Sequence, residues 1–322
     1  MLKILNAEPD RYSRKAFETL KQIAQVDEIN LSGSDLLKAS SQYDILIVRL
    51  RSYISKDFFT PESRMKYLVT ATTGIDHVDT RAAEENGTTI LNLRGETDFL
   101  RTITATSEHT IGLILALLRH IPFAHKSVLE NNWNRDLFIG RDLCSQTLGL
   151  IGLGRLGSKV AEFAKAFDMK IKAYDPFIPD KEWPEYVERC SSLSEILSSS
   201  SIISLHVHLD DSTKGMIGET EVKKMANGAV IINTSRGALI NEQALLDGLN
   251  SGKLGGAALD VLAEEIHDGS KNSPLLSYAI KHDNLIITPH IGGATLDSMH
   301  NTEEFMVKKL IDRLSKDGII KP

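Results

Sequence analysis

The sequence predicts an α/β protein with two doubly wound parallel sheets, and three observations support this fold class. Short apolar runs rich in β-branched residues alternate with longer amphipathic stretches, which is the pattern of a mostly parallel sheet covered by helices. The runs form two series, separated by one strongly apolar segment. At roughly 100 to 200 residues per domain, a chain of 322 residues has room for two such domains.

The first series of apolar runs fills the N-terminal third of the chain and predicts one compact domain. We expect strands at residues 2–5, 44–48, 66–70 and 88–91. Amphipathic stretches between them predict helices at residues 14–24 and 80–86.

The second series begins near residue 146 and predicts a second sheet. We expect its strands at residues 147–152, 171–175, 201–206, 228–234, 255–261 and 284–290. Six strands at this spacing fill a doubly wound sheet. The Ser-rich stretch at 191–201 reads as a helix flanked by caps and turns.

Two further helices are expected outside these series. Residues 107–119 are apolar nearly all round, which predicts a buried helix where the two domains meet, with Ser107 as its N-cap. Residues 296–314 have helical periodicity, and we expect this helix to pack back against the first domain.

Composition excludes several classes of partner and site. The chain has 43 Asp and Glu against 37 Lys and Arg and no basic run, which excludes nucleic acid and an anionic membrane surface as partners. Cys144 and Cys190 form no CxxC pattern, so we expect neither a disulfide framework nor a metal site, and a reducing compartment. The longest apolar run, 111–118, is far shorter than the roughly 20 residues that span a bilayer. These features predict a cytoplasmic protein.

A glycine-rich turn, GLGRLG at 152–157, follows a strand-like run and opens an amphipathic helix. The first glycine permits a tight turn, the second lets the backbone approach a pyrophosphate, and the third lets helix and strand pack closely. The helix N-terminus then offers N–H groups and a positive dipole to the anion. The sequence therefore predicts a dinucleotide site that includes five residues of the turn: Gly152, Gly154, Arg155, Leu156 and Gly157.

Asp175 ends the next predicted strand, 18 residues after Gly157 (175 − 157 = 18). At this position a carboxylate can accept hydrogen bonds from the ribose hydroxyl groups. Because the same carboxylate would repel a 2′-phosphate, the sequence favours NAD over NADP.

Three residues that carry useful chemistry stand at or just beyond the carboxyl ends of predicted strands: Arg236, Glu265 and His290. In an open α/β sheet this edge is where ligands bind. We therefore expect these side chains to form a catalytic group.

Taken together, these motifs resemble the D-isomer-specific 2-hydroxyacid dehydrogenase family, in a phosphoglycerate dehydrogenase-like form without a regulatory domain. The resemblance rests on GLGRLG with Asp175, NTSRGALINEQAL, GGAALDVLAEE and TPHIGG, and extends to TTGIDHVD and SEHTIGLILALLR. It implies a Rossmann NAD-binding domain at 104–291, inserted into a flavodoxin-like catalytic domain at 1–103 and 292–322.

The resemblance also implies a role for each reacting residue. Arg236 would grip the substrate carboxylate and polarise the carbonyl with its rigid fork of donors. His290 would carry the proton, and Glu265 would pair with its imidazole and orient it. Asp260 and His206, each at a strand end, are expected near the cofactor.

In the first domain, the resemblance points to a loop that holds the substrate. Thr73 and Gly74 resemble the family loop whose backbone N–H groups bind the substrate carboxylate. Arg51 follows a strand and resembles a position that faces the active-site cleft.

The segment 92–110 is longer than the usual family connection, and we expect it at the mouth of the cleft. Arg94 and Arg101 would there accept a second anionic or hydroxyl-rich end of the substrate. The alternative is that they pair with Glu96 and Asp98 to hold the loop, because exposed ion pairs are common.

Two positions depart from the family pattern without removing a reacting group. Ile266 follows the catalytic Glu where the family usually has Pro, and His208 stands where Pro is expected in SLHVHL.

The function that the sequence predicts is an NAD-dependent oxidoreductase that transfers a hydride between nicotinamide and C2 of a D-2-hydroxy acid or 2-keto acid. The alternatives are a short 3-phosphoglycerate dehydrogenase and, in another class, a nicotinamide-sensing corepressor or scaffold on the same fold. The complete Arg/Glu/His set favours the enzyme. By resemblance, helix 107–119 and the arm through Trp133 form a homodimer surface. The identity of the 2-keto acid stays open.

Overall fold

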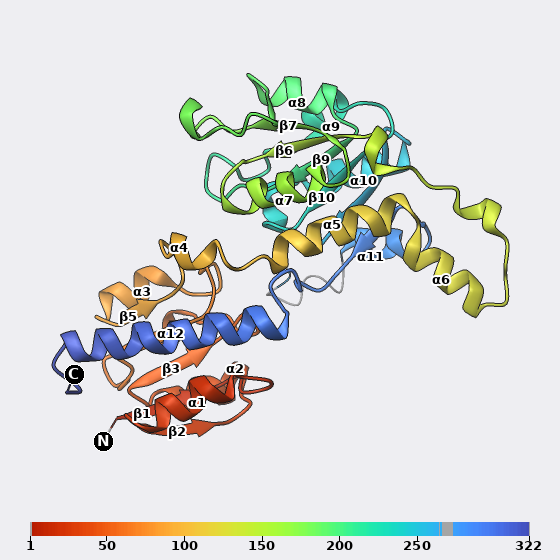
Figure 1. Ribbon diagram of the computed structural model, residues 1–322. Coiled ribbons are helices and arrows are strands. Elements are labelled where there is room, and N and C mark those ends of the chain that lie inside the picture. Colours follow the sequence, from red (N-terminus) through yellow and green to blue (C-terminus); the bar gives the residue numbers. More distant parts are fainter. Residues whose placement is uncertain (1, 264, 266–272, 322) are drawn as a thin grey trace. The chain divides into compact units, whose positions relative to one another are not determined.

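The computed structural model describes residues 2–263, 265 and 273–321, which form two compact units (Figure 1). The first unit combines Met1–Ile103 with Ala294–Pro322, and the second is Thr104–Gly293. Each unit contains a parallel sheet covered by helices, which confirms the predicted α/β class with two parallel sheets.

Within the described residues, the first unit has a five-stranded parallel sheet in the order β2-β1-β3-β4-β5. This is the strand order of flavodoxin-like doubly wound folds. Its strands are β1 Lys3–Asn6, β2 Gln25–Glu28, β3 Ile45–Val48, β4 Tyr67–Thr70 and β5 Thr89–Leu91. β3 and β4 are buried along their whole length, because helices cover both faces of the sheet.

The helices of the first unit come from both ends of the chain. They are α1 Arg14–Lys21, α2 Gly33–Ser40, α3 Thr80–Glu85, α4 Thr97–Leu100 and α12 Leu296–Lys316, with a 3-10 turn at Lys56–Phe58. Helix α12 packs against α1, β4 and β5, and buries Met306, Leu310 and Leu314 along one face. The C-terminal helix thereby completes the N-terminal core.

Strand β2 was predicted wrongly, because the helix was expected to run to Ala24, and helices α2 and α4 were not predicted. The helix ends at Lys21, and residues Gln25–Glu28 pair in parallel with β1. β2 is an edge strand of sequence QVDE with no buried position. A strand without a buried face carries no alternation of apolar and polar residues, so the sequence pattern did not predict this strand.

In the second unit, the described residues form a parallel sheet of seven strands in the order β12-β11-β10-β9-β6-β7-β8. The strands are β6 Thr147–Ile151, β7 Lys170–Tyr174, β8 Glu188–Arg189, β9 Ile202–Leu205, β10 Ala229–Asn233, β11 Leu254–Leu259 and β12 Leu285–Ile287. The direction of winding reverses between β6 and β9, which is where such sheets bind ligands. The two-residue exposed edge strand β8 is the strand missing from the prediction.

Helices cover the sheet of the second unit (Figure 1). They are α5 Ala105–Leu118, α6 Ile121–Leu129, α7 Arg155–Lys165, α8 Leu193–Ser199, α9 Glu219–Lys224, α10 Glu242–Asn250 and α11 Pro274–Ala279. Short 3-10 turns lie at Arg135–Phe138, Leu143–Ser145, Asp180–Glu182 and Gly237–Leu239. The apolar helix α5 packs against α7, β10, β11 and β12.

The start of α5 differs from the prediction that Ser107 is its N-cap. The helix begins at Ala105, with Thr104 at the cap position. Ser107 lies inside the first turn, fully buried, and its hydroxyl donates to the Leu156 carbonyl at 3.3 Å. The side chain is therefore a tertiary contact and does not cap its own helix.

In the part of the chain that the structure describes, no single helix has both the length and the apolar character needed to cross a membrane. Residues Thr97–Leu118 and Ile121–Leu129 reach that length and composition only together, with a bend of 58° between them.

Candidate active site

The glycine-rich turn lies between β6 and α7, at the switch point of the second sheet. Gly152 has φ +94°, and a Cβ there would lie 2.5 Å from the His206 carbonyl oxygen. A Cβ on Gly157 would lie 2.1 Å from the Gly152 carbonyl oxygen. A Cβ on Gly154 would meet no atom within 4 Å. Two glycines are thus required by the fold itself, whereas Gly154 faces open space at the N-terminus of α7.

Asp175 follows β7 and lies directly beside the glycine turn. Its Oδ2 accepts the Leu153 N–H at 2.8 Å, and its Oδ1 accepts the Phe177 N–H at 2.9 Å. Because a carboxylate oxygen can accept more than one hydrogen bond, Asp175 keeps capacity for ribose hydroxyl groups. Arg155 and Leu156 are the first two residues of α7. Burial lowers the pKa of the Arg155 guanidinium.

His206 follows β9 on the other flank of the glycine turn. Its backbone N–H donates to the Ile151 carbonyl at 2.7 Å, and its Nε2 contacts the Ser204 hydroxyl at 2.8 Å. Desolvation lowers the pKa of His206 from 6.5 to about 4, so the ring is neutral near neutral pH.

The lowered pKa of His206 predicts a pH-dependent stability. Between pH 6.5 and about 4 the unfolded chain binds a proton that the folded protein excludes, so stability falls as the pH falls through this range. The full loss is about 3 kcal/mol, at about 1.4 kcal/mol per pKa unit. We expect urea unfolding to show that the free energy of unfolding falls less between neutral pH and pH 4 for His206→Asn than for wild type. An equal fall in both proteins would contradict a contribution from His206.

Glu265 and His290 form the best-defined pair of the site. The His290 Nδ1 lies 2.6 Å from the Glu265 Oε1, and the Glu265 Oε2 accepts the Leu262 N–H at 3.1 Å. Both side chains are part-exposed, at 30% for His290 and 24% for Glu265. A carboxylate is an acceptor, so Nδ1 carries the proton of this bond and Nε2 is left for proton transfer.

The loop that carries His290 is held by Asp260, at the end of β11. His290 has φ +53°, an unfavourable backbone conformation for a residue with a side chain. Its N–H donates to the Asp260 carbonyl at 2.8 Å. The Asp260 carboxylate accepts the N–H groups of Ile291 at 2.9 Å and Gly292 at 2.7 Å, and the Thr288 hydroxyl at 2.6 Å. The carboxylate therefore fixes a strained loop.

Asp260 was expected near the cofactor, and in the structure its carboxylate binds the loop of His290. It is 1% exposed. Burial raises its pKa, but hydrogen bonds from His109, Thr288, Ile291 and Gly292 outweigh burial and hold the pKa below its usual value. The Oδ2 accepts one N–H, from Gly292, and can still accept a donor from a bound cofactor.

Arg236 lies in the loop after β10, beside the segment that carries Glu265. The Asn233 side chain holds this loop by donating to the Arg236 carbonyl at 2.8 Å. A Cβ on Gly237 would lie 2.0 Å from the backbone of Leu262, so the backbones of the two loops are in close contact at this glycine. The structure therefore brings together the loops of Arg236, Glu265 and His290 at the carboxyl edge of one sheet.

The predicted substrate residues of the first unit lie after its strands. Thr73 and Gly74 belong to an irregular loop after β4, in which the Thr72 hydroxyl donates to the Gly74 carbonyl at 2.7 Å. Arg51 is exposed, and its guanidinium donates to the Ala7 carbonyl at 2.9 Å. Arg51 thus contacts its own unit, and its role toward a substrate remains a prediction.

The long segment 92–110 contains a short helix, α4, fixed to α12 of the same unit. The Phe99 and Phe305 rings stack at 4.0 Å between centroids, and Lys309 pairs with Glu96 at 2.5 Å. Arg101 lies near Asp98 at 3.7 Å, in an exposed pair of the kind that the alternative prediction named, whereas Glu96 is bound by Lys309. Arg94 is exposed, and its N–H donates to Asn92 Oδ1.

Sequence reasoning missed two site residues that the fold brings beside Asp260. These residues are His109 and Thr288: the His109 Nε2 lies 3.1 Å from the Thr288 hydroxyl and 3.2 Å from the Asp260 Oδ1.

Ile266, the expected departure from the family pattern, lies outside the described residues. His208 is exposed in the loop after β9, and its carbonyl accepts the Thr213 hydroxyl at 2.7 Å.

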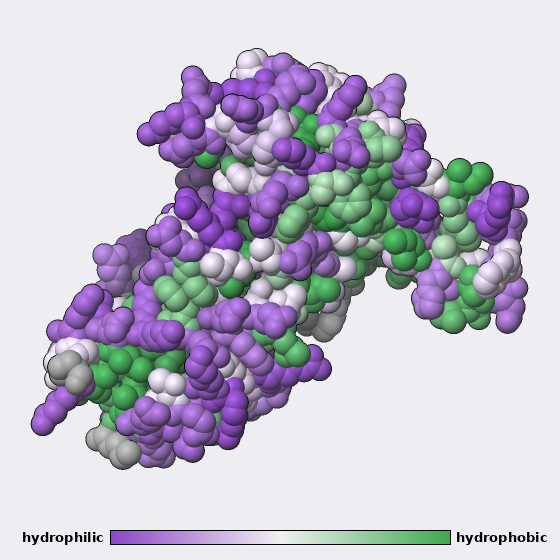
Figure 2. All heavy atoms as spheres, in the orientation of Figure 1, coloured by the Kyte–Doolittle hydropathy of each residue, from purple (hydrophilic) through white to green (hydrophobic). Residues whose placement is uncertain are grey.

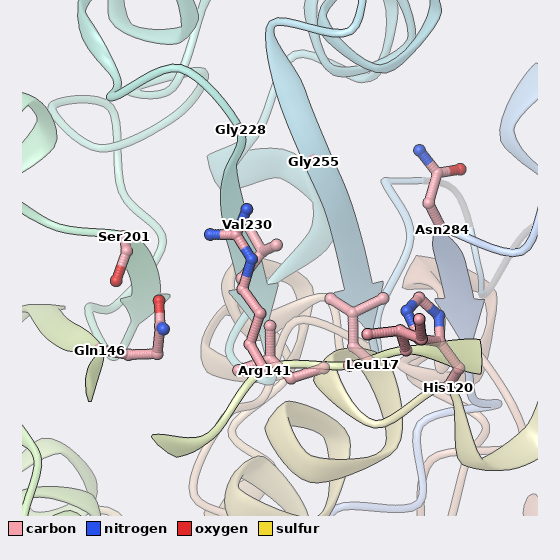
Figure 3. A pocket seen from close by; sticks show the side chains of 12 residues that line it. Leu117, His120, Arg141, Gln146, Ser201, Gly228, Val230, Gly255 and Asn284 are labelled. Atoms are coloured by element: carbon pink, nitrogen blue, oxygen red, sulfur yellow. The ribbon is translucent and has the colours of Figure 1, made fainter. Parts of the chain in front are cut away.

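A cavity of about 160 Å³ lies at the opposite, amino edge of the second sheet (Figure 3). Its walls include Gln146, Ser201 and Asn284, each just before a strand, together with His120 and Arg141. The three candidate reacting residues follow the other ends of the strands, so this cavity is separate from their site.

Comparison with known proteins identifies the family. Residues 111–292 match the family described as "D-isomer specific 2-hydroxyacid dehydrogenase, NAD binding domain". The chain belongs to the D-isomer specific 2-hydroxyacid dehydrogenase family. This is a family of oxidoreductases, as the resemblance of the motifs implied.

Individual relatives extend the match over nearly the whole chain. A hydroxypyruvate reductase of Thermotoga maritima is 36% identical over 91% of this chain and 92% of its own length. A D-3-phosphoglycerate dehydrogenase of Synechocystis sp. is 34% identical over 95% of this chain, which spans only 53% of that protein. The crystal structure of D-lactate dehydrogenase from Aquifex aeolicus, complexed with NAD and lactic acid, has a TM-score of 0.82 and 27% identity, and covers 98% and 96% of the two chains.

Proposed function

We propose that this protein catalyses NAD-dependent interconversion of a 2-keto acid and a D-2-hydroxy acid. The observation that carries the proposal is the 2.6 Å pair of His290 and Glu265 on the sheet that also bears the glycine turn. The loop of Arg236 touches the segment of Glu265, so a cation lies on the neighbouring loop. A proton carrier, an anion-binding group and a dinucleotide cradle suit this reaction.

The residues of the turn fit a dinucleotide. Gly154 leaves open the space into which a Cβ would project, and the N-terminus of α7 lies there without a capping side chain. Backbone N–H groups and the helix dipole would hold the pyrophosphate at this point. Asp175 would accept the ribose hydroxyl groups, and the neutral His206 lies on the other flank of the turn.

The roles of the reacting residues follow from their chemistry. When bound, the nicotinamide supplies or accepts the hydride at C2 of the substrate. Arg236 binds the substrate carboxylate and polarises the carbonyl through charge-assisted hydrogen bonds. His290 donates a proton from Nε2 to the developing alkoxide during reduction and accepts it during oxidation. Glu265 holds and orients the ring through Nδ1.

The proposal is tested by a screen of NADH oxidation against a panel of 2-keto acids. The panel includes short, aromatic, phosphorylated and dicarboxylic acids, so that it also covers the oxidation product of 3-phosphoglycerate. We expect reduction of at least one of them. NADH binding without turnover of any panel member would favour the nicotinamide-sensing alternative.

Asp175 leads us to propose NAD as the preferred cofactor. Repulsion between its carboxylate and a 2′-phosphate is expected to favour NADH over NADPH in kcat/KM by about 10²-fold or more, since like charges in contact cost several kcal/mol. Asp175→Ala is expected to narrow this ratio, whereas Asp180→Ala, on the exposed loop that follows, leaves it unchanged. Equal kcat/KM for the two cofactors in wild type would contradict the assignment.

We also propose a homodimer formed through α6 and the arm that follows it. Large apolar side chains are exposed there: Ile121 at 53%, Leu129 at 69%, Trp133 at 86%, Leu137 at 59% and Ile139 at 77%. Figure 2 shows apolar residues gathered over this part of the second unit. A patch of this kind on a folded protein marks an interaction surface.

Sedimentation at micromolar concentration is expected to give a dimer for wild type. The double variant Leu129→Glu/Trp133→Glu is expected to be monomeric, because it places two charges in an apolar contact. Ile280→Glu is the matched control, since Ile280 is 81% exposed on a different helix end, and it should remain dimeric. A monomeric wild-type protein would contradict the proposal.

We further propose a reducing compartment, the cytoplasm. Both cysteines are free thiols, and Cys144 is exposed. Thiols of this kind persist where glutathione and thioredoxin keep them reduced. Cell fractionation of the tagged protein tests this placement, and recovery in a secreted fraction would reject it.

A further inference from the structure

Helix α5 is apolar along most of its length, but its first two turns carry three polar side chains that reach the loops of the site. Ser107 and Thr110 are fully buried, and the side chain of His109 is 20% exposed. Buried polar groups are costly unless they are hydrogen-bonded, so their partners define what they do. Each of the three bonds a different segment of the candidate site.

His109 contacts the loop that carries His290. The Thr288 hydroxyl donates to the Asp260 Oδ1 at 2.6 Å, so the oxygen of Thr288 is available as an acceptor. The His109 Nε2 lies 3.1 Å from that oxygen and 3.2 Å from the Asp260 Oδ1, which makes its N–H a donor shared between them. His109 therefore completes the group that fixes the strained backbone of His290.

Thr110 contacts the loop that carries Arg236. Its hydroxyl donates to the Thr106 carbonyl at 2.8 Å, inside its own helix. The Thr234 hydroxyl lies 2.8 Å from the Thr110 hydroxyl. Because Thr110 has one hydroxyl proton and already donates it to Thr106, Thr234 is the donor of this bond. Thr234 is 7% exposed and two residues before Arg236, so this buried bond fixes the base of that loop.

Ser107 contacts the glycine turn. Its hydroxyl donates to the Leu156 carbonyl at 3.3 Å, in the first turn of α7. One rigid helix thus bonds the cofactor turn, the loop of Arg236 and the loop of His290 within two turns.

We propose that the N-terminal face of α5, made of Ser107, His109 and Thr110, is the positioning element that sets the three site loops in register. This inference rests on the proposed function for its effect on catalysis, but its structural claim concerns the loops alone. Small displacements of reacting groups reduce rate steeply, by about 10²-fold for 1 Å. His109 and Thr110 are therefore expected to control turnover without touching the substrate.

The variants His109→Leu and His109→Gln separate positioning from packing. His109→Leu removes the N–H donor, and we expect kcat to fall by about 10²-fold while the Kd of NADH changes by less than about 3-fold. His109→Gln keeps an N–H donor at the end of a flexible side chain, and we expect it to recover at least about 10-fold of the lost kcat. A loss shared equally by both variants would overturn the role of the hydrogen bond.

Thr110→Val tests the second loop. Because Arg236 binds the substrate carboxylate, loosening its loop is expected to raise KM for the keto acid by about 2- to 10-fold, the scale of one neutral hydrogen bond. Thr302→Val is the matched control, since Thr302 is also buried in a helix and donates to its own i−4 carbonyl, of Ser298, at 2.8 Å. Thr302 lies in the first unit, and its variant should leave KM unchanged.

Amide hydrogen exchange of the full chain gives a readout that needs no substrate. We expect peptides covering residues 288–293 to exchange about 10-fold faster in His109→Leu, and peptides covering 233–238 to do so in Thr110→Val, with neither effect in Thr302→Val. Unchanged exchange rates in both loops, or equal acceleration in the control, would overturn the proposal.

If wild type reduces no keto acid, the proposed function fails, while the exchange rates still decide the positioning claim. If His109→Leu does not fold, His109→Gln and Thr110→Val carry the test.

Discussion

Replacement of His290 by alanine is expected to lower kcat for 2-keto acid reduction by about 10²- to 10⁴-fold, the range that a positioned proton carrier contributes. Glu265 binds the Nδ1 of His290 at 2.6 Å. The Nε2 is therefore the ring nitrogen that exchanges a proton with the substrate in our proposal. NADH binding, measured by fluorescence titration, should survive, since the glycine turn lies after a different strand.

His282→Ala is the matched control for this variant. His282 is exposed and stacks on Tyr278 at 4.0 Å, away from the loops of the site, so its loss should leave kcat unchanged. Glu265→Gln should give an intermediate loss, because an amide keeps the contact but not the charge. Full activity of His290→Ala with every substrate would remove His290 from the reaction.

The second large effect is expected at the glycine turn, where two neighbouring substitutions should separate folding from cofactor binding. Gly154→Ala adds a methyl group into open space, so stability should change little while the Kd of NADH rises by about 10- to 100-fold, the cost of overpacking a close contact. Gly157→Ala places its methyl group 2.1 Å from the Gly152 carbonyl oxygen, so the folded protein itself must shift. We expect Gly157→Ala to lower Tm as well as cofactor affinity.

Thermal unfolding without cofactor and NADH titration together check this pair. Unchanged NADH affinity in Gly154→Ala would show that the pyrophosphate does not approach this backbone. An unchanged Tm in Gly157→Ala would show that helix and turn tolerate a wider separation than the structure has.

The parallel α/β architecture could be predicted because buried strands and amphipathic helices leave opposite patterns in the sequence. Strands β3, β4, β9 and β10 are buried along their whole length and read as apolar runs. Once the strands are parallel, residues that follow them lie at one edge, which is how Arg236, Glu265 and His290 could be grouped in advance. The pairing of Glu265 with His290 was implied by the family resemblance. The exposed edge strands β2 and β8 carried no such pattern.

The positioning residues could not be predicted in the same way, because their meaning depends on tertiary neighbours. His109 and Thr110 sit in a helix whose sequence indicates only burial, and their partners Thr288 and Thr234 are more than a hundred residues away. One signal was present: polar residues in the first turns of an otherwise apolar helix require buried partners. The packing of α4 on α12 was hidden for the same reason, since the Phe99–Phe305 contact joins distant segments.

The most direct test of the proposed activity follows both products of one reaction. Wild-type protein is mixed with NADH and each 2-keto acid of the panel, NADH is followed by absorbance, and the hydroxy acid is resolved by chiral chromatography. We predict that one NADH is consumed for each D-2-hydroxy acid formed, and that His290→Ala slows both together. Formation of the L isomer, or NADH that binds but is not oxidised by any keto acid, would contradict it.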